Sequence, residues 1–479
     1  MTLSEYCAAL GLRGKPAEDR DVERICCSTG DELKNALFFC IPGSKEDGHT
    51  FARQAIAAGA AAVVCQKDTG EKNQLFSDDT ARDYALAAQL FYRNPAKRLR
   101  LVAVTGTNGK TTVSHMLCRI AEHCGIATGV IGTLGATFRG ETIPTQRTTP
   151  SAGELARILA EFSQKGAELV VLEASSHALV QRRLAGLGFA AGIFTNLSRD
   201  HLDYHRTMED YFAAKALLCS QSDRMVINID DSYGRRLCKR TDRPLTYSAQ
   251  WTAGDLRATE LSLFSGGSRF TVRGEGVAEK INLSQPGLFS VSNGLAALGG
   301  AVALGLDPHL AAEGLSSFRG VRGRAEVLSR QDDICIVCDY AHSGDSLEKI
   351  LRALRWGLQG RLILLFGCAG GRDRSKRFPM AEAAARFADR VILSSDNPRW
   401  EDPLEIIGEV SGYLESLGAD FVAEPDREKA IALALAETKP GDTLLLAGKG
   451  HEDYQELAAG KIPMDERKIV SRLLAERKY

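Results

Sequence analysis

The sequence predicts an α/β protein of three domains, in which two separate parallel sheets each carry helices on both faces. Length is the first observation, because 479 residues are too many for one hydrophobic core. The second is a series of apolar runs from Leu101 onward that end in polar or glycine residues and precede helical patterns, as buried parallel strands do. The third is a similar series that starts near residue 323. We expect domains of residues 1–98, 99–322 and 323–479.

Composition and charge exclude several classes of protein. The formal net charge is −1 and 44% of the residues are hydrophobic, as in ordinary globular proteins. Such a low net charge gives no indication of a nucleic-acid partner or of a membrane surface. The first twenty residues lack the apolar core of a signal peptide, and no apolar run approaches the length of a membrane span. We expect a cytoplasmic protein, and a monomer.

The twelve cysteines do not form a metal-binding pattern. Cys335 and Cys338 have a spacing that zinc ligands use, but they lie in a β-rich run without a second pair at zinc spacing. We therefore expect them to be buried strand residues with reduced thiols, which fits the cytosol.

The first domain contains short apolar strands and helices of small residues. Examples are "NALFFCIPG" and "QAIAAGAAAVVC". The stretch "LFYRNPAKRLR" then brings a proline and a basic cluster, which is typical of a linker.

A glycine-rich turn opens the second domain, between the apolar run "LVAVT" and an amphipathic helical pattern. Gly106 and Gly109 would let the backbone approach an anion, and the helix N-terminus would add partial positive charge. Lys110 could bridge the outer phosphates, and Thr111 could offer its hydroxyl to Mg²⁺. The usual phosphate loop has a glycine where this chain has Val104. A glycine turn before an ordinary helix is the alternative, and the GKTT after a strand argues against it.

Three further polar residues of this domain are candidates for a metal site. Glu173 ends the run "ELVVLE" and would face the loop across neighbouring strands. His201 lies in a polar cluster after the next strand, and Lys215 lies in a helical pattern. By themselves, Glu173 could equally be a helix cap, His201 a loop histidine whose hydrogen bonds are made within the protein, and Lys215 a lysine that faces solvent.

The remaining segments complete the expected fold. Residues 261–287 alternate polar and apolar side chains, which predicts antiparallel strands added to the central domain. The third domain repeats the parallel pattern in "DICIVCDYAH", "RLILLFGCAGG", "RVILSSDNPR" and "DTLLLAGKGHE", which predicts a second doubly wound sheet.

Taken together, "GTNGKTT", Glu173, "TNLSRDHLDYH" and "AAK" resemble the Mur ligases of peptidoglycan synthesis, whose shorter phosphate loop this is. The motifs "SSHALVQRR", "DYAHSGDSLEKIL", "GRDRSKR", "DNPRWEDP" and "AGKGHEDYQ" extend the resemblance nearly end to end. The resemblance implies an N-terminal UDP-binding domain, a central ATP-binding domain and a C-terminal Rossmann-like domain that binds an amino acid. It also implies a role in cell-wall biogenesis, and hence in cell shape and division.

The resemblance implies an ATP-dependent, ADP-producing ligase. ATP would phosphorylate the γ-carboxylate of UDP-N-acetylmuramoyl-L-alanyl-D-glutamate, and an amino acid would attack the acyl phosphate. Mg²⁺ would be held by Thr111, Glu173, His201 and Lys215, the lysine as a carbamate, which binds metal like a carboxylate. The implied ATP contacts are Gly106, Thr107, Asn108, Gly109, Lys110, Thr111, Thr112, Asn293, Arg324 and Asp339. The implied contacts of the UDP precursor are Ser28, Thr148, Thr149, Ser175, Gln181 and Arg183.

The motif "DNPRWEDP" points to the amino acid that is added. Within the family such a motif marks enzymes that add meso-2,6-diaminopimelate, whose distal carboxylate Arg399 could hold with two parallel hydrogen bonds. Glu452 would meet the distal ammonium. The other implied contacts are Arg372, Asp396, Asn397, Pro398 and Gly448. The alternatives are a ligase that adds L-lysine or another amino acid, an enzyme like folylpolyglutamate synthetase, and an inactive paralogue that only binds its ligands.

The chain departs from the usual family pattern at several positions. Ser343 and Gly344 replace a common Thr-Pro, Gly371 replaces an aspartate, and Ser290 replaces an asparagine. The loop at residues 41–49 matches the uridine-side loop only loosely. These departures leave the proposed ligands in place, and they bear on the recognition of uridine and of the amino acid.

Overall fold

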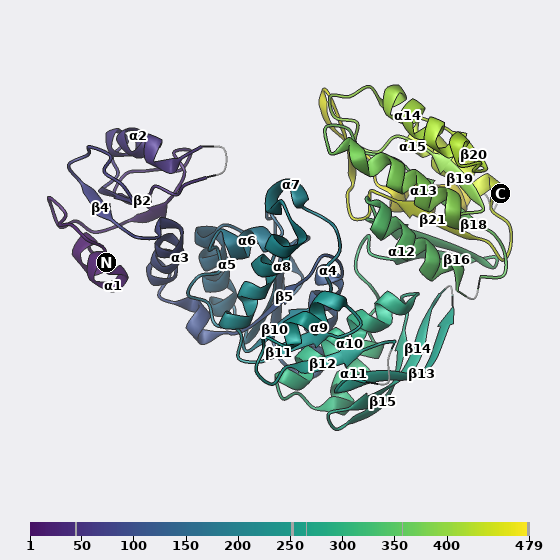
Figure 1. Cartoon of the computed structure of the whole chain (residues 1–479), viewed down its shortest axis with the longest axis horizontal. Helices are drawn as coiled ribbons and strands as arrows, with labels where there is room; N and C mark the ends of the chain where they lie inside the picture. Colours follow the sequence, from purple (N-terminus) through teal and green to yellow (C-terminus); the bar gives the residue numbers. More distant parts are fainter. Residues whose placement is uncertain (44–45, 251–252, 265, 357, 477–479) are drawn as a thin grey trace.

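The computed structural model describes residues 1–43, 46–250, 253–264, 266–356 and 358–476. The described residues form three main sheets, which follow one another along the chain and have four, eleven and six strands. A two-stranded hairpin lies near the C-terminus. Figure 1 shows three bodies in which the middle one, in blue to green, lies between the other two. The α/β class, with a central doubly wound sheet followed by a second one, is confirmed.

The N-terminal sheet is parallel and has the strand order β1-β2-β3-β4. Helix α3 leads out of it and packs on helix α5 of the middle body, where an added Cβ on Gly153 would lie 2.5 Å from the hydroxyl of Tyr84. The elements are α1 Leu3–Leu10, β1 Arg24–Cys26, β2 Ala36–Phe39, α2 Ala52–Ala57, β3 Ala62–Cys65, β4 Gln74–Phe76, α3 Thr80–Phe91 and the 3₁₀ turn Pro95–Arg98. Ser44 and Lys45 of the expected uridine-side loop lie outside the described residues.

The middle sheet has the order β15-β14-β13-β12-β11-β10-β5-β9-β6-β7-β8. Its centre is parallel, and β13, β14 and β15 pair in antiparallel fashion as the alternation predicted. The strands are β5 Arg100–Thr105, β6 Thr128–Gly132, β7 Gly135–Phe138, β8 Glu141–Ile143, β9 Leu169–Glu173, β10 Ala191–Phe194, β11 Met225–Asn228, β12 Leu245–Ser248, β13 Leu256–Phe264, β14 Gly267–Gly274 and β15 Val277–Leu283.

Two apolar clusters, one on each face, hold helices against this sheet. Helices α4, α10 and α11 share one cluster, to which the predicted apolar face of α4 contributes Val113, Met116, Leu117 and Ile120. Helices α5, α6, α8 and α9 share the other. The helices are α4 Lys110–His123, α5 Ala152–Gln164, α6 Ser176–Val180, α7 Leu202–His205, α8 Met208–Ala216, α9 Ser232–Cys238, α10 Leu288–Ala303 and α11 Pro308–Ser316.

The C-terminal sheet has the order β16-β17-β21-β18-β19-β20, with β16 as an antiparallel edge. Helices α12, α13 and α14 cover one face, and α15 and α16 the other. Cys335 and Cys338 are buried in β17, as expected, and within the described ranges no three metal-ligating side chains gather. The strands are β16 Glu326–Gln331, β17 Ile334–Asp339, β18 Leu362–Phe366, β19 Arg390–Leu393, β20 Phe421–Ala423, β21 Thr443–Ala447, β22 Tyr454–Leu457 and β23 Gly460–Pro463. The helices are α12 Gly344–Arg355, α13 Arg377–Phe387, α14 Pro403–Ser416, α15 Arg427–Glu437 and α16 Glu466–Glu476.

The positions that depart from the family pattern have structural explanations. Ser343 caps α12, and an added Cβ on Gly344 would lie 2.6 Å from Pro379, so the small residue lets α12 approach α13. The Ser290 hydroxyl donates to the carbonyl of Pro286 at 2.7 Å. Gly371 has φ +61°, and an added Cβ would lie 2.5 Å from the ring of Trp400, which covers that turn. Each departure is thus accommodated by local packing.

Among the described residues, none of the helices combines the length and the apolar character needed to cross a bilayer.

A buried ion pair joins the last two helices to the C-terminal sheet. Both side chains of Arg427 and Glu466 are 1% exposed or less, and the guanidinium also donates to the carbonyl of Ala447 at 2.8 Å. We expect Glu466→Ala to destabilise this domain by about 3–5 kcal/mol, because it leaves a buried charge without its partner.

Urea unfolding followed by tryptophan fluorescence can measure the loss, since two of the three tryptophans, Trp356 and Trp400, lie in this domain. Glu428→Ala, which breaks a solvent-exposed pair with Arg472, is the matched control and should cost less than about 1 kcal/mol. Equal losses in the two variants would contradict the burial argument.

Candidate functional site

The glycine turn at residues 106–109 lies at the carboxyl end of β5 and leads directly into α4. Its glycines are required by space as well as by conformation. Gly106 has φ +151°, and an added Cβ would lie 1.9 Å from the hydroxyl oxygen of Thr195; Gly109 has φ +87°, and its Cβ would lie 2.5 Å from Oδ1 of Asn293. The turn therefore fits tightly against the end of β10 and against α10.

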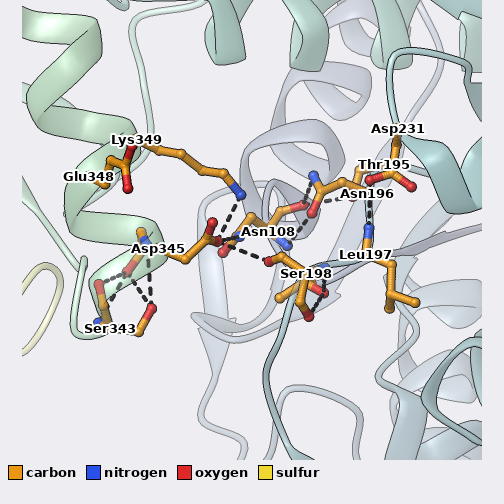
Figure 2. A network of polar contacts seen from close by, with 12 residues as sticks. Asn108, Thr195, Asn196, Leu197, Ser198, Asp231, Ser343, Asp345, Glu348 and Lys349 are labelled. Carbon is orange, nitrogen blue, oxygen red and sulfur yellow. Dashed lines mark hydrogen bonds and ion pairs between the residues drawn. The ribbon is translucent and has the colours of Figure 1, made fainter. Parts of the chain in front are cut away.

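The segment after β10 fixes the backbone of the turn. The hydroxyl of Thr195 donates to the carbonyl of Asn108 at 2.6 Å, and Oδ1 of Asn196 accepts from the Asn108 N–H at 3.0 Å. The N–H of Thr107 donates to the carbonyl of Asn196 at 2.9 Å. Figure 2 shows Thr195 and Asn196 beside Asn108. The turn is thus held in place before any ligand arrives.

Two lysines meet at one carbonyl oxygen of the turn. Nζ of Lys110 lies 2.9 Å from the Gly106 oxygen, and Nζ of Lys215 lies 2.8 Å from the same atom. Lys215 is 1% exposed, so the solvent-facing alternative for this helix residue is wrong. Burial, and then the charge of Lys110, lowers the pKa of the Lys215 amine well below its usual value. Burial also lowers the pKa of Lys110, against the opposing effect of Glu173.

Glu173, at the end of β9, faces the turn as predicted. Its carboxylate accepts hydrogen bonds from the Thr111 hydroxyl and from both the N–H and the hydroxyl of Thr133, each at 3.0 Å. The side chain is fully buried, and an added Cβ on Gly132 would lie 2.0 Å from Oε1. A carboxylate and a hydroxyl side by side are oxygen ligands of the kind that Mg²⁺ prefers.

His201 and Lys215 both lie close to the ring of Tyr211. The His201 ring centroid is 6.2 Å from that of Tyr211, and Nζ of Lys215 lies 4.7 Å from the Tyr211 centroid. The side chain of His201 is half exposed, on a residue with φ +54° that precedes α7. Burial lowers the pKa of His201, while Asp200 opposes the shift. A neutral imidazole can serve as a metal ligand.

The residues assigned to the UDP precursor form one hydrogen-bonded group, with one exception. The Thr149 hydroxyl lies 3.0 Å from Oγ of Ser175, and Nη1 of Arg183 donates to the Thr149 carbonyl at 2.7 Å. Nη2 of Arg183 donates to Oε1 of Gln181 at 2.5 Å. The hydroxyl oxygen of Thr148 lies 3.2 Å from that of Thr133, the residue that donates hydrogen bonds to Glu173.

Ser28 is the exception, because it follows β1 in the N-terminal sheet and its hydroxyl accepts from the N–H of Gly30. Arg147, which was not predicted from the sequence, carries a charge that acts on both parts. Burial, and then the charge of Arg147, lowers the pKa of Arg183, and the same charge opposes the rise, caused by burial, in the pKa of Cys27, next to Ser28. A basic residue before two threonines was the available signal.

The C-terminal domain touches the phosphate-loop region directly. Asp345 of α12 accepts from the Ser198 hydroxyl at 2.9 Å and from Nδ2 of Asn108 at 3.4 Å, and Lys349 lies 2.7 Å from the same carboxylate oxygen (Figure 2). Lys376 adds a longer ion pair to Asp200, 3.6 Å. The sequence argument missed these residues, because a contact between domains leaves no periodic pattern.

Three of the residues predicted to contact ATP lie in or near the C-terminal domain. The guanidinium carbon of Arg324 lies 4.7 Å above the Tyr340 ring, and its charge acts on the pKa of Lys110. Asp339 accepts from the N–H groups of Ala325 and Ala341, and burial raises its pKa. Asn293 is buried against Gly109.

A second polar group gathers the predicted amino-acid contacts of the C-terminal domain. Nδ2 of Asn397 donates to Oε2 of Glu452 at 2.8 Å. Arg399, at φ +54°, donates through Nε to Glu456 at 2.9 Å and through Nη1 to the carbonyl of Gly370 at 2.6 Å. Gly448 has φ +110°, and an added Cβ would lie 2.7 Å from Asp396. Arg372 is exposed on the same loop as Gly370.

Lys449 lies at the centre of this group, and the sequence argument missed it. It is fully buried, with Nζ 2.6 Å from Oδ1 of Asn397 and 2.9 Å from Oε2 of Glu452. Lysine is seldom buried without a partner, so its place directly after an apolar strand was a signal that could have been used.

Family descriptions match most of the chain. "Mur ligase family, catalytic domain" matches residues 27–105, "Mur ligase middle domain" matches residues 104–301, and "Mur ligase, glutamate ligase domain" matches residues 323–450.

Individual proteins are similar over the full length. A UDP-N-acetylmuramoyl-L-alanyl-D-glutamate–2,6-diaminopimelate ligase of Gloeobacter violaceus is 40% identical, over 100% of this chain and 99% of its own. The ligase of the same name from Synechococcus elongatus is 42% identical, over 94% of this chain and 92% of its own. A solved structure of a ligase of that name superposes with a TM-score of 0.75 at 31% identity, covering 100% of this chain and 99% of the other.

The close approach of Gly132 to Glu173 can be tested by adding one methyl group. We expect Gly132→Ala to displace the carboxylate and to lower nucleotide-dependent turnover by about 10- to 100-fold, the usual cost of disturbing a ligand's support. Steady-state phosphate release measures the effect. Gly188→Ala is the matched control, because its Cβ would meet no atom within 4 Å. Unchanged turnover in Gly132→Ala would contradict the role of Glu173.

Proposed function

The chain belongs to the Mur ligase family, and we propose that it is the ATP-dependent ligase that adds meso-2,6-diaminopimelate to UDP-N-acetylmuramoyl-L-alanyl-D-glutamate. The product would be a precursor of peptidoglycan, and the reaction would take place in the cytoplasm. The observation that carries the proposal is the arrangement of the glycine turn, which lies between Lys110, Lys215 and Glu173. Asp345 of the C-terminal domain accepts a hydrogen bond from Asn108 of the same turn. Full-length similarity to ligases of that name supports the substrates.

The turn is suited to binding the phosphates of ATP. Free N–H groups at the start of α4, the Lys110 ammonium and the facing Arg324 all favour negative charge. Phosphoryl transfer to the γ-carboxylate of the D-glutamyl residue brings two anions together, and this positive surrounding offsets their repulsion. The amine of the amino acid would then attack the acyl phosphate, and phosphate would leave as the amide forms.

The donor set fits Mg²⁺, which would lie beside Thr111 and Glu173. When bound, the ion would neutralise charge on the transferring phosphoryl group. Burial lowers the pKa of the His201 imidazole, a candidate metal ligand, and lowers the pKa of the Lys215 amine well below its usual value. Only a neutral amine can react with CO₂ to form a carbamate, so the environment of Lys215 supports this modification.

The amino-acid pocket fits a substrate with a distal carboxylate and a distal ammonium. Nη2 of Arg399 and Oε1 of Glu452 carry no hydrogen bond from the described part of the chain. They would meet the two charged groups of the distal head. L-Lysine has the ammonium alone, so the arginine would contribute nothing to its binding.

The alternatives are less well supported. A folylpolyglutamate-synthetase-like enzyme would lack the N-terminal parallel sheet and the DNPR motif that this chain has. An inactive paralogue would have no need to keep Lys110, Glu173, His201 and Lys215 in one site. Ligation assays with purified precursor, with diaminopimelate and L-lysine compared by mass spectrometry, separate all of these possibilities.

Lys110→Ala tests the phosphate loop. We expect ligation to fall by at least about 10²- to 10³-fold, because the variant loses a charge aimed at the transferring phosphoryl group. Product formation by mass spectrometry gives the rate. Lys165→Ala, which removes an exposed lysine of the same domain, should be as active as the unmodified chain. Ligation retained in Lys110→Ala would refute the assignment.

Arg399→Ala tests the amino-acid site. We expect KM for diaminopimelate to rise about 10- to 100-fold, the loss of one charge-assisted hydrogen bond, while KM for ATP stays within about twofold. Arg374→Ala, an exposed arginine of the neighbouring loop, is the control. An equal rise in both KM values would indicate misfolding of the domain instead.

A further inference from the structure

A single buried ammonium group connects three of the residues assigned to the amino-acid substrate. Nζ of Lys449 lies 2.6 Å from Oδ1 of Asn397, 2.9 Å from Oε2 of Glu452 and 3.8 Å from Oδ1 of Asp396. The lysine follows β21 and its side chain is fully buried. Nothing about the substrate itself requires a lysine at this place, because both charges of the distal head already have a candidate partner.

The hydrogen bonds around Lys449 fix the orientation of Asn397. Its Oδ1 accepts from Lys449 and from the N–H of Glu456 at 2.9 Å, while its Nδ2 donates to Oε2 of Glu452 at 2.8 Å. The reverse orientation of the amide would place two donors against Lys449 and an acceptor against a carboxylate. Asn397 is therefore held in one orientation, and Glu452 with it.

This arrangement divides the two oxygens of Glu452 between two tasks. Oε2 is bonded to both Lys449 and Asn397. Oε1 has no hydrogen-bond partner among the residues that the structure describes. One oxygen thus fixes the carboxylate, and the other remains for a cation that enters the pocket.

The positive charge of Lys449 also affects the pKa of the neighbouring Asp396. Asp396 and Glu452 place two carboxylates close together, and burial raises the pKa of Asp396 while Lys449 opposes the rise. Without the ammonium, Asp396 would take up a proton more readily, since burial and the neighbouring charge of Glu452 both raise its pKa. The other titratable or charged groups near the pair and Lys449 are Tyr340, Cys368, Arg427, His451, Tyr454 and Glu466.

We propose that Lys449 is a positioning residue, which holds Glu452 so that its free oxygen receives the distal ammonium of the amino-acid substrate. The proposal rests on the proposed function and assigns the preference for a distal amine to a residue outside the DNPR motif. It also separates two kinds of recognition in the pocket. Arg399 would select the distal carboxylate, and the Lys449–Asn397–Glu452 group would select the distal ammonium.

The test compares diaminopimelate with 2-aminopimelate, which has the distal carboxylate and no distal amine. We expect Lys449→Met to raise KM for diaminopimelate about 10- to 100-fold, as loss of a supporting contact does, and to change KM for 2-aminopimelate less than about threefold. KM for ATP should stay within about twofold. The preference of the enzyme for diaminopimelate, measured as the ratio of the two kcat/KM values, should therefore fall by at least about tenfold.

A pH series adds a readout that a purely structural role would not move. In Lys449→Met, Asp396 loses the charge that opposes the rise of its pKa by burial, so it should take up a proton as the pH falls and no longer add its negative charge to the site that receives the ammonium. The KM for diaminopimelate should therefore be higher at pH 6.5 than at pH 8.5 in the variant. The unmodified chain should show a smaller difference.

Lys461→Met is the matched control. Lys461 lies 3.8 Å from the centroid of the same Tyr454 ring over which Lys449 lies, but it is exposed and makes no contact with Asn397 or Glu452. This variant should keep the substrate preference unchanged. If Lys449→Met does not fold, Lys449→Gln is the second variant: its amide can still donate to Asn397, but it has no charge to pair with Glu452, so the preference for diaminopimelate should still fall.

Equal rises in KM for the two substrates would overturn the proposal, and so would an unchanged preference in a folded Lys449 variant. These outcomes differ from failure of the proposed function, in which the unmodified chain itself would not ligate diaminopimelate.

Discussion

The convergence of Lys110 and Lys215 on the carbonyl oxygen of Gly106 is the interaction on which the site depends. Lys110 and Lys215 can approach one oxygen only because Gly106 has no side chain and because Thr195 and Asn196 hold the backbone of the turn from the other side. Burial, and then the charge of Lys110, lowers the pKa of Lys215, while Lys110 places positive charge where phosphate would lie. Glu173, on the neighbouring strand, supplies the opposite charge beside the Thr111 hydroxyl, and both offer oxygen atoms of the kind that Mg²⁺ prefers.

The geometry of the parallel sheet explains why these groups meet. Strands β9, β5 and β10 are neighbours, and all three end at the same edge of the sheet. Glu173, the glycine turn and the segment from Thr195 each follow one of these strands directly. Residues that are 60 to 90 positions apart in the chain therefore come together without any long loop, as ligand sites of doubly wound sheets do.

The C-terminal domain repeats this principle with different chemistry. Asp396 follows β19 and Lys449 follows β21, two parallel strands with β18 between them, and the site is again built on a buried ammonium with oxygen partners. In the C-terminal domain the ammonium group of Lys449 fixes the position of other side chains, whereas the positively charged groups at the glycine turn are placed to bind an anion. The bonds from Asp345 to Ser198 and Asn108 connect the two sites, because α12 carries Asp345 from the second sheet to the turn of the first.

The sequence by itself determined the α/β class, the parallel runs, the antiparallel extension and the glycine turn with Lys110, Thr111 and Glu173. These features depend on periodicity, on glycine conformation and on residues adjacent to strands, all of which are local. Only the tertiary structure decided that Lys215 and Asn293 are buried, that Ser28 lies apart from Thr149, and that Lys449 and Asp345 have partners. Burial of a helix lysine, or a bond between domains, depends on what packs against the residue from elsewhere in the chain, and a local pattern carries no information about that.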